Sequence, residues 1–360
     1  MQQRYSVVIA GCGDRGAWHA HGFKENSDRF DLRAVCDRHV DRAAALASRF
    51  DVRSTFSDVE EMLANERPDV FCFCTMPKVR LDLVKLGLKY NVKAIALEKP
   101  LAIELPEARE IAALCDAAGV KLVVSHQQKY GKAWRAVKEI VDRGDIGTVT
   151  EIHATARAWS GQQGTHLADY MIWFNDRSPV KWVVGQAIGT KMLDDSHPSP
   201  DYVVASLEFE NGVRGVIECG AHAPHNIPGK APIGDMDFWT DSSITIRGTH
   251  GFATVVTGGG WQAFTKTSNG TLLSGDGYFD PSHEQPLYIR DLADWLDDST
   301  RRHSCDGSIS LHGFEVINAA YLSALNRRRI DLPIKEIPFH PVLDQLRTYL
   351  PTTDEYAITR

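Results

Sequence analysis

A glycine-rich turn directly after an apolar run near the N-terminus constrains the fold more than any other stretch. Residues 7–10 are apolar and mostly β-branched, as expected of a strand buried on both faces. The run leads into Gly11, Gly13 and Gly16, which have the spacing G-x-G-x-x-G. The first glycine permits a tight turn, the second lets a pyrophosphate approach the backbone, and the third lets a helix pack closely. The N-terminus of that helix would offer unpaired N–H groups to phosphate.

A second strand-like run supports a dinucleotide site. Residues 32–36 end at Asp37, which lies about 20 residues beyond Gly16, as does the acid that bonds a ribose hydroxyl in such sites. Asp37 favours NAD because a carboxylate repels a 2′-phosphate, whereas Arg38 beside it could accept that phosphate, so NADP stays possible. A tight turn in another kind of α/β protein is the alternative interpretation.

Composition and charge exclude several classes of protein. A chain of 360 residues is too long for one ordinary core and favours two domains. The formal net charge of −7 argues against a nucleic-acid partner. We expect no secretory leader, and no apolar run approaches the roughly 18 residues needed to span a membrane. Seven cysteines at scattered spacings suggest reduced thiols in a soluble, cytoplasmic protein.

Alternating strand and helix patterns predict a Rossmann domain over residues 1–125, with a parallel sheet and right-handed crossovers. From residue 148 the apolar period changes to two, and turn signals separate the later strand-like runs. We therefore expect residues 126–360 to form an α+β domain with a large, open, mainly antiparallel sheet. Its tail, residues 338–360, could form an arm that wraps a neighbouring subunit.

Two groups of possible metal ligands are weak candidates. Cys72 and Cys74 would point to the same face of a buried strand, but no second cysteine pair answers them. His222 and His225 have the spacing H-x-x-H in a loop, without a nearby cysteine or acidic partner. We expect ordinary buried thiols and no metal site, and the loop from residue 222 to 239 is a better candidate for lining a substrate cleft.

Three further motifs follow the glycine turn and Asp37: T-M-P at residues 75–77, E-K-P at 98–100 and G-T-H-L-A-D at 164–169. With these motifs, the chain resembles the Gfo/Idh/MocA oxidoreductases, which include glucose-fructose oxidoreductase and inositol dehydrogenase. The resemblance covers almost the whole chain, and the order of the last two motifs makes it specific. It implies a homodimeric or homotetrameric NAD(P)-dependent dehydrogenase that oxidises a secondary hydroxyl of a sugar, polyol or sugar derivative.

The resemblance implies catalytic roles for two residues. The lysine of E-K-P lies beside the nicotinamide in the family and touches the substrate hydroxyl, and this role carries over to Lys99. An ammonium group there would stabilise a developing alkoxide. The family's general base carries over to His166, whose imidazole can take the hydroxyl proton as hydride leaves. Without the resemblance, a surface lysine and a structural histidine are the alternative interpretations.

Further residues are expected around the substrate. Gln162 is a departure, because the family's sugar and inositol dehydrogenases usually carry Asp four residues before the histidine. An amide can bond a hydroxyl group but cannot raise the basicity of an imidazole. Asp169 is three residues after His166, on the same helix face, and could orient the imidazole. Trp159 and Tyr130 could offer stacking faces to a sugar ring.

The cofactor is expected to lie at the carboxyl ends of the strands. The candidate cofactor-binding residues are Gly11, Cys12, Gly13, Asp14, Arg15, Gly16, Asp37, Arg38, Thr75, Met76, Pro77, Glu98, Lys99 and Gln127. Two other functions remain open. An enzyme with tightly bound NAD could oxidise a sugar transiently for elimination or glycosidic cleavage, which the amide at Gln162 favours. A non-catalytic dinucleotide-binding sensor is less consistent with the presence of both Lys99 and His166.

Overall fold

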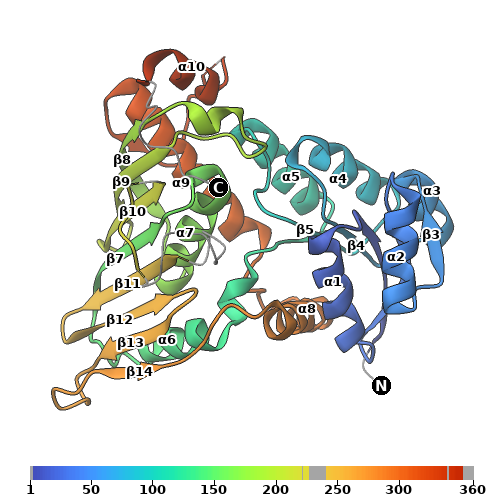
Figure 1. Cartoon of the computed structure of the whole chain (residues 1–360), viewed down its shortest axis with the longest axis horizontal. Coiled ribbons are helices and arrows are strands. Elements are labelled where there is room, and N and C mark those ends of the chain that lie inside the picture. Colours follow the sequence, from blue (N-terminus) through green and yellow to red (C-terminus); the bar gives the residue numbers. More distant parts are fainter. Residues whose placement is uncertain (1–2, 221, 227–240, 339, 352–360) are drawn as a thin grey trace. The chain divides into compact units, whose positions relative to one another are not determined.

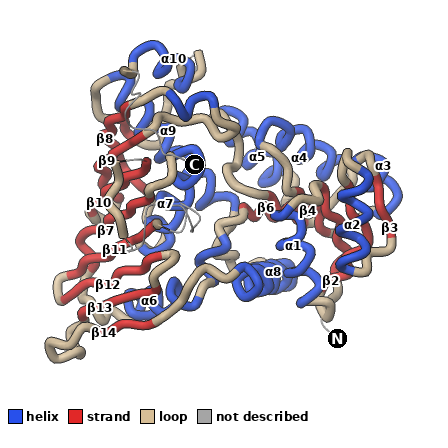
Figure 2. Tube along the Cα trace, in the orientation of Figure 1, coloured by secondary structure: helices blue, strands red, loops and turns tan. Residues whose placement is uncertain are grey.

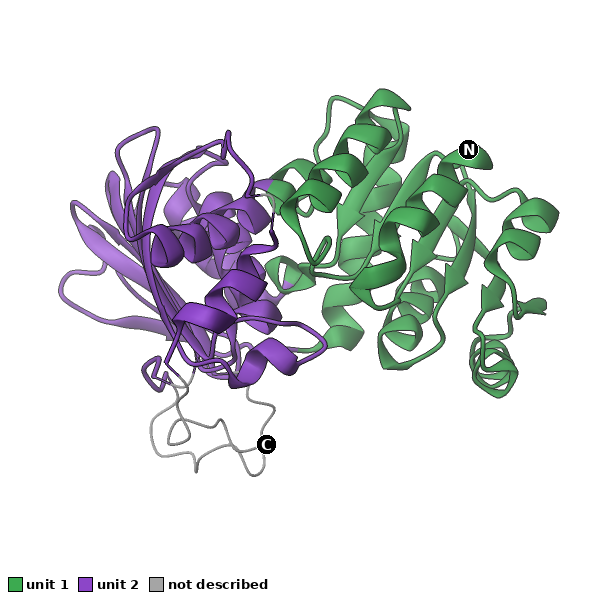
Figure 3. Cartoon of the chain, turned by 90° about the horizontal axis from the view of Figure 1, so that it is seen from above, with its two compact units in different colours: residues 1–130, 280–311 green, residues 131–279, 312–360 purple. Residues whose placement is uncertain are grey.

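The computed structural model describes residues 3–220, 222–226, 241–338 and 340–351. The chain forms two compact units: unit 1 comprises residues 1–130 and 280–311, and unit 2 comprises residues 131–279 and 312–360 (Figure 3). These units differ from the expected division at residue 125. Residues 126–130 and 280–311 belong to the first unit because α8 (Pro281–Asp297) packs against α1 (Asp14–Glu25) and against the short helix η2 (Gln127–Tyr130).

Unit 1 is built on a six-stranded parallel sheet with the strand order β3-β2-β1-β4-β5-β6. The strands are β1 (Tyr5–Ala10), β2 (Phe30–Cys36), β3 (Ser54–Phe56), β4 (Val70–Phe73), β5 (Ala94–Leu97) and β6 (Lys121–Val124). The direction of winding reverses between β1 and β4, and doubly wound sheets bind ligands outside the carboxyl ends of the strands at this point. The predicted Rossmann architecture is confirmed.

Helices cover both faces of this sheet (Figure 1). Besides α1 and α8 they are α2 (Val40–Phe50), α3 (Val59–Glu66), η1 (Pro77–Val79), α4 (Arg80–Lys89) and α5 (Leu105–Ala117). α1 contacts α2 and α8, whereas α4 contacts α3 and α5. The close approach of α8 requires Gly22 on α1, because a Cβ there would lie 2.9 Å from Cγ1 of Ile289. The shared core includes Val7, Ile9, Phe23, Phe30, Ile289 and Leu292.

Unit 2 contains a nine-stranded sheet with the order β14-β13-β12-β11-β7-β10-β9-β8-β15. The strands are β7 (Val149–Ala156), β8 (Val180–Ile188), β9 (Tyr202–Phe209), β10 (Arg214–Gly220), β11 (Ser242–Gly248), β12 (Gly251–Val256), β13 (Gly260–Phe264), β14 (Leu273–Gly275) and β15 (Ile330–Asp331). Neighbouring strands are antiparallel except for β7 and β10. The sheet is therefore mixed and mainly antiparallel, as predicted.

The helices of unit 2 lie against one face of the nine-stranded sheet (Figure 2). They are α6 (Lys132–Asp142), α7 (Ser160–Phe174) and α9 (Gly307–Asn326), which begins in unit 1; η3 (Lys191–Asp194) and α10 (Val342–Tyr349) lie near the end of the sheet. α7 contacts β7, β10 and β11, and α6 contacts β12 and β13. Gly185 on β8 lets α9 approach closely, because a Cβ there would lie 2.6 Å from the carbonyl oxygen of Ala320.

The C-terminal tail that was expected to form an arm includes α10. The Arg347 guanidinium donates to Asp194 at 2.8 Å and to the carbonyl of Leu193 at 2.9 Å, within the same unit. Residues 352–360 lie outside the described residues, as do 227–240, most of the loop expected to line a substrate cleft. All seven cysteines are free, and no helix in the described part of the chain is long and apolar enough to cross a membrane.

Candidate functional site

The glycine turn between β1 and α1 has the geometry of a phosphate-binding turn. Gly11 has a φ of +93°, and a Cβ on it would lie 2.6 Å from the carbonyl oxygen of Cys74. A Cβ on Gly16 would lie 2.0 Å from the carbonyl oxygen of Gly11, so α1 could not approach the turn with any larger residue. Gly13 is different, because a Cβ there would meet nothing within 4 Å. The two outer glycines shape the turn, and the middle one leaves space where a pyrophosphate can approach the N-terminus of α1.

The carboxylate of Asp37, directly after β2, is fixed against this turn. Its Oδ2 accepts a hydrogen bond from the backbone N–H of Cys12 at 2.8 Å, and its Oδ1 accepts one from the N–H of His39 at 2.9 Å. Each oxygen keeps further lone pairs, which could accept from a ribose diol. Arg38 is exposed beside it. The residues present therefore fit the adenosine end of a dinucleotide.

Lys99 follows β5 and is half-buried among charged groups of unit 1. Burial is the main cause that lowers the pKa of Lys99, and the guanidinium groups of Arg15 and Arg80 lower it further. The Glu98 carboxylate opposes this shift, and the resulting pKa is about 8. Glu98 itself is buried, and its Oε1 lies 3.1 Å from Nε2 of His19. Burial alone would raise the pKa of Glu98, but His19, with help from Arg15 and Lys99, lowers it to about 2. The site therefore combines an ammonium group whose pKa lies near neutral pH with a carboxylate that stays ionised.

Arg80, at the start of α4, is a candidate that sequence reasoning missed. Its side chain is only 1% exposed, and Nη2 donates to the carbonyls of Thr75 at 2.9 Å and Lys99 at 3.2 Å. It thus joins the segments that follow β4 and β5. Within the described residues, its Nε and Nη1 and the Thr75 hydroxyl have no hydrogen-bond partner. Buried donors of this kind at a strand end are suited to bind a polar ligand there. An arginine three residues after Pro77 gave no signal, because helix-start arginines are usually exposed.

The other cofactor candidates of unit 1 occupy varied positions. Gly13, Asp14, Arg38 and Met76 are exposed, Arg15 and Thr75 are half-buried, and Cys12, Gly16, Pro77 and Gln127 are buried. Gln127 is held by the hydroxyl of Ser125, which donates to its Oε1 at 3.1 Å. Tyr130 requires a correction. Its ring is 3% exposed and packs edge-on against Tyr288, while its hydroxyl bonds to Asp291, so it offers no open face for a sugar.

The second proposed catalytic residue, His166, lies on α7 in unit 2. Its Nδ1 is 2.8 Å from the hydroxyl of Tyr170, one helical turn further along. Tyr170 is 1% exposed and packs against the ring of Trp134, with centroids 4.5 Å apart. This bond fixes the orientation of the imidazole. Tyr170 was missed by sequence reasoning, although its i+4 position on the helix was a usable signal.

The remaining substrate candidates of unit 2 lie on α7 with His166 or directly before its first residue. Gln162 is half-buried, one turn before His166, and Asp169 is fully buried. Trp159 precedes the first residue of α7, is 6% exposed, and donates its indole N–H to the carbonyl of His197 at 3.2 Å. That burial leaves little of its face open for stacking. The start of α7 thus carries Gln162 and His166, and the imidazole is held by a phenol that sequence reasoning did not predict.

Two family models match the chain. One is described as an oxidoreductase family with an NAD-binding Rossmann fold and matches residues 5–126, and the other is the GFO/IDH/MocA C-terminal domain and matches residues 134–254. Together they cover more than half of the sequence. The two matches correspond to the parallel sheet of unit 1 and to the first part of the mixed sheet of unit 2.

Named relatives and solved structures agree with these matches. The chain is 23% identical to a D-apiose dehydrogenase from Rhizobium rhizogenes over 90% of this chain and 96% of that protein. It is 27% identical to a D-apiose dehydrogenase from Paraburkholderia graminis, but over only 60% of each protein. An oxidoreductase from Agrobacterium radiobacter, solved with NAD+, L-tartaric acid and magnesium, superposes with a TM-score of 0.76 at 20% identity, covering 91% of this chain and 98% of that one. At that identity the likeness shows a shared fold.

Proposed function

Because the chain belongs to the Gfo/Idh/MocA family of oxidoreductases and carries its NAD-binding Rossmann domain, we propose that it oxidises a secondary hydroxyl group of a sugar, polyol or sugar derivative. Curated relatives that support this substrate class are named D-apiose dehydrogenase and myo-inositol 2-dehydrogenase. The observation that carries the proposal is the arrangement in unit 1. A glycine turn bonded to Asp37 lies at the same sheet edge as Lys99, which is half-buried and whose pKa is affected by Arg80 and Glu98.

NAD would be held by groups that are already in place. The glycine turn leaves space for the pyrophosphate, and the Asp37 carboxylate, fixed by two backbone N–H groups, accepts hydrogen bonds from the ribose diol. The same carboxylate repels a 2′-phosphate, so we propose that NAD is preferred to NADP. When bound, the nicotinamide ring supplies the hydride acceptor.

Lys99 stabilises the negative charge that develops on the substrate oxygen. An ammonium group with a pKa of about 8 is mostly charged at neutral pH, but its proton is held less firmly than that of an exposed lysine. It can therefore donate a strong hydrogen bond to a developing alkoxide. Arg80 holds the Lys99 carbonyl and thereby fixes the backbone from which the ammonium extends.

His166 accepts the hydroxyl proton at Nε2. This requires the tautomer in which Nδ1 carries hydrogen, and the Tyr170 oxygen at 2.8 Å can accept a hydrogen bond from that N–H. The balanced reaction converts the secondary alcohol to a ketone or lactone, with the hydride leaving carbon and the proton passing to the imidazole. Gln162, one turn away on α7, can bond a substrate hydroxyl through its amide.

The amide of Gln162 also supports a second candidate function. An enzyme that retains NAD and oxidises a sugar only transiently, for elimination or glycosidic cleavage, would return the hydride in each cycle. The family's usual carboxylate at this position could raise the basicity of the histidine, whereas the amide of Gln162 can only bond a sugar hydroxyl. We further propose a homo-oligomer and, from the odd number of scattered cysteines, a reducing compartment such as the cytoplasm.

The decisive experiment measures reduction of NAD and NADP against a panel of free sugars, inositols, sugar acids and glycosides. Wild type, Lys99→Ala and the control Lys85→Ala are compared, the control because Lys85 is half-exposed and ion-paired with Glu110. Turnover on one substrate class, lost in Lys99→Ala and kept in Lys85→Ala, is the expected result. Equal turnover in both variants would contradict the role of Lys99. No net reduction, with NAD retained through purification and a glycoside consumed, would favour the transient oxidation.

A further inference from the structure

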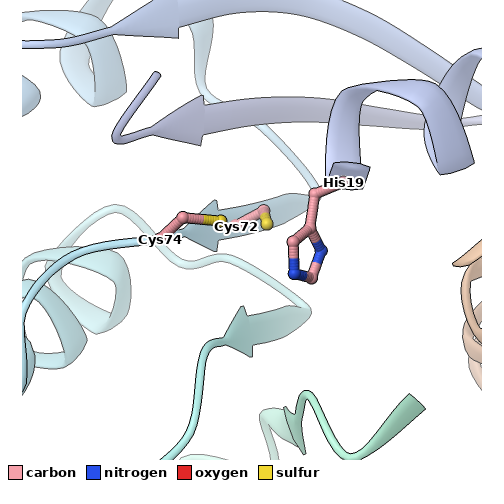
Figure 4. Close-up of side chains that lie close together, drawn as sticks. All are labelled: His19, Cys72 and Cys74. Carbon is pink, nitrogen blue, oxygen red and sulfur yellow. The ribbon is translucent and has the colours of Figure 1, made fainter. Parts of the chain in front are cut away.

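A histidine of α1 lies next to the two cysteines at the end of β4. Cys72 is in β4 and Cys74 directly follows the strand, so both side chains point to the same face of the sheet. His19 faces them from α1, and Figure 4 shows its imidazole beside the two thiol groups. One ring nitrogen and the two sulfur atoms all lie within 4.8 Å of one another. The sequence offered no second cysteine pair, but the fold supplies a third potential ligand from an earlier helix.

The three side chains are held in place by their surroundings. His19 is fully buried, its Nδ1 lies 3.0 Å from the amide nitrogen of Gln285, and its Nε2 lies 3.1 Å from Oε1 of Glu98. The backbone N–H of Cys74 donates to the carbonyl of Ala10 at 2.8 Å, which fixes the segment behind the glycine turn. Cys72 is fully buried, whereas Cys74 is partly exposed, so the group lies at the border of the core.

Two thiolates and one imidazole form a donor set that suits zinc. Zinc sites use sulfur at about 2.3 Å and nitrogen at about 2.0 Å, which places donor atoms roughly 3.5–3.8 Å apart. Separations of up to 4.8 Å therefore need to shrink by about 1 Å, which small side-chain rotations can provide. A histidine that binds a metal through one ring nitrogen usually donates a hydrogen bond through the other. For His19 the acceptor would be Gln285 on α8, whose side-chain amide lies at Nδ1 and would have to turn its oxygen toward that nitrogen. A zinc ion bound at Nε2 would replace the contact of this nitrogen with Oε1 of Glu98, and the carboxylate would then offset the charge of the ion.

We propose that His19, Cys72 and Cys74 form a zinc-binding site inside unit 1. A fourth position is left for a small exogenous ligand such as water. The site does not rest on the proposed dehydrogenase activity, because neither Lys99 nor His166 belongs to it. Binding transfers no electrons. Each coordinated thiol gives up its proton to solvent, and Nε2 of His19 must also lose the hydrogen that it donates to Glu98 before it can bind Zn²⁺.

The test uses the full chain, purified under reducing conditions and freed of metal with a chelator. Co²⁺ is added as a spectroscopic substitute for Zn²⁺. We expect a thiolate-to-cobalt charge-transfer band that saturates at one ion per chain and disappears when Zn²⁺ is added. The absence of this band, together with no zinc retained after gel filtration, would overturn the proposal.

A pair of cysteine variants locates the ion. Cys74→Ser removes a partly exposed ligand, and Cys115→Ser is the matched control because Cys115 is a buried free thiol on α5 in the same unit. We expect Cys74→Ser to lose the charge-transfer band and Cys115→Ser to keep it. Zinc should raise the melting temperature of the control, because it binds the folded state, and should leave that of Cys74→Ser unchanged. Equal cobalt binding by the two variants would contradict the assignment, even if zinc bound elsewhere.

Discussion

The two proposed catalytic side chains lie in contrasting surroundings. Lys99 in unit 1 is placed among charges, with two guanidinium groups and one carboxylate acting on it. His166 in unit 2 is bonded to the neutral phenol of Tyr170, whose ring packs against that of Trp134. Charges act over several ångströms and change how tightly a proton is held, whereas a single neutral hydrogen bond chiefly fixes orientation and tautomer. Substitutions of charged residues that do not contact Lys99 should therefore change its pKa. The function of His166 should change mainly when its hydrogen bond to Tyr170 is removed.

The largest effect is expected from the imidazole itself. Replacing His166 by Asn removes the proposed base but keeps a polar side chain, and general-base loss typically costs about 10²–10⁴-fold in kcat. The measurement is steady-state turnover on the substrate found in the panel. His250→Asn serves as the control, since His250 is exposed on a turn between strands. If His166→Asn turned over at the rate of wild type, another group would have to be the general base that accepts the hydroxyl proton.

A smaller effect is expected from Arg80. Arg80→Met removes the hydrogen bonds to Thr75 and Lys99, and misplacement of this kind can cost roughly 10–100-fold in kcat/KM. It also removes one of the two positive charges that, together with burial as the main cause, lower the pKa of Lys99 to about 8. The pKa of Lys99 should therefore rise. The ammonium group then stays protonated to a higher pH, and the alkaline loss of activity should move to higher pH by the same amount.

Arg80→Lys separates the two effects, because it keeps a charge but cannot join the two carbonyls in the same way. We expect it to lower the rate and leave the alkaline side of the pH profile close to that of wild type. If the profiles of Arg80→Met and Arg80→Lys coincide, the charge of Arg80 does not act on Lys99, and the contrast between the two sites weakens.

Tyr170→Phe should have a milder effect on the second site. The ring and its packing on Trp134 remain, and only the hydrogen bond to His166 is lost. One neutral hydrogen bond is worth about 1 kcal/mol, so kcat should fall by about fivefold. The matched control is Tyr321→Phe, which removes another buried hydroxyl of unit 2, one bonded to Ser160. A loss as large as that of His166→Asn would mean that Tyr170 does more than orient the imidazole.

Local patterns predicted the architecture, and they also allowed the residues proposed for one end of the site to be named. The glycine spacing and Asp37 act through backbone geometry and a short chain separation, so the sequence alone indicates them. Arg80 and Tyr170 were missed because their roles depend on which groups the fold brings to a side chain. Tyr130 was misjudged for the same reason. Its environment is set by α8, which returns from the far end of the sequence to pack on η2.

Unit 1 also holds a buried carboxyl group whose effect should be visible in stability rather than activity. Glu284 on α8 is 1% exposed, and burial raises its pKa to about 9, with the Asp280 carboxylate adding to the shift although a hydrogen bond from the Asp280 N–H opposes it. The folded chain therefore keeps a proton that the unfolded chain loses near its ordinary pKa of 4.5.

A group whose pKa is raised on folding contributes its full stabilisation below the unfolded value and loses it as pH rises toward the folded one. Glu284→Gln keeps an oxygen for the Asp280 N–H but cannot ionise. Its unfolding free energy should equal that of wild type near pH 4 and exceed it by about 1–3 kcal/mol at pH 8, since the linkage is at most about 1.4 kcal/mol per pH unit. Urea unfolding at several pH values measures this, with Glu110→Gln as the exposed control. Turnover should not change. If the unfolding free energies of wild type and Glu284→Gln depend on pH in the same way, the ionised carboxylate of Glu284 must find a partner in the folded chain. Burial in unit 1 would then perturb ionisable groups less than the low pKa of Lys99 suggests, and the contrast between the surroundings of Lys99 and of His166 would be smaller.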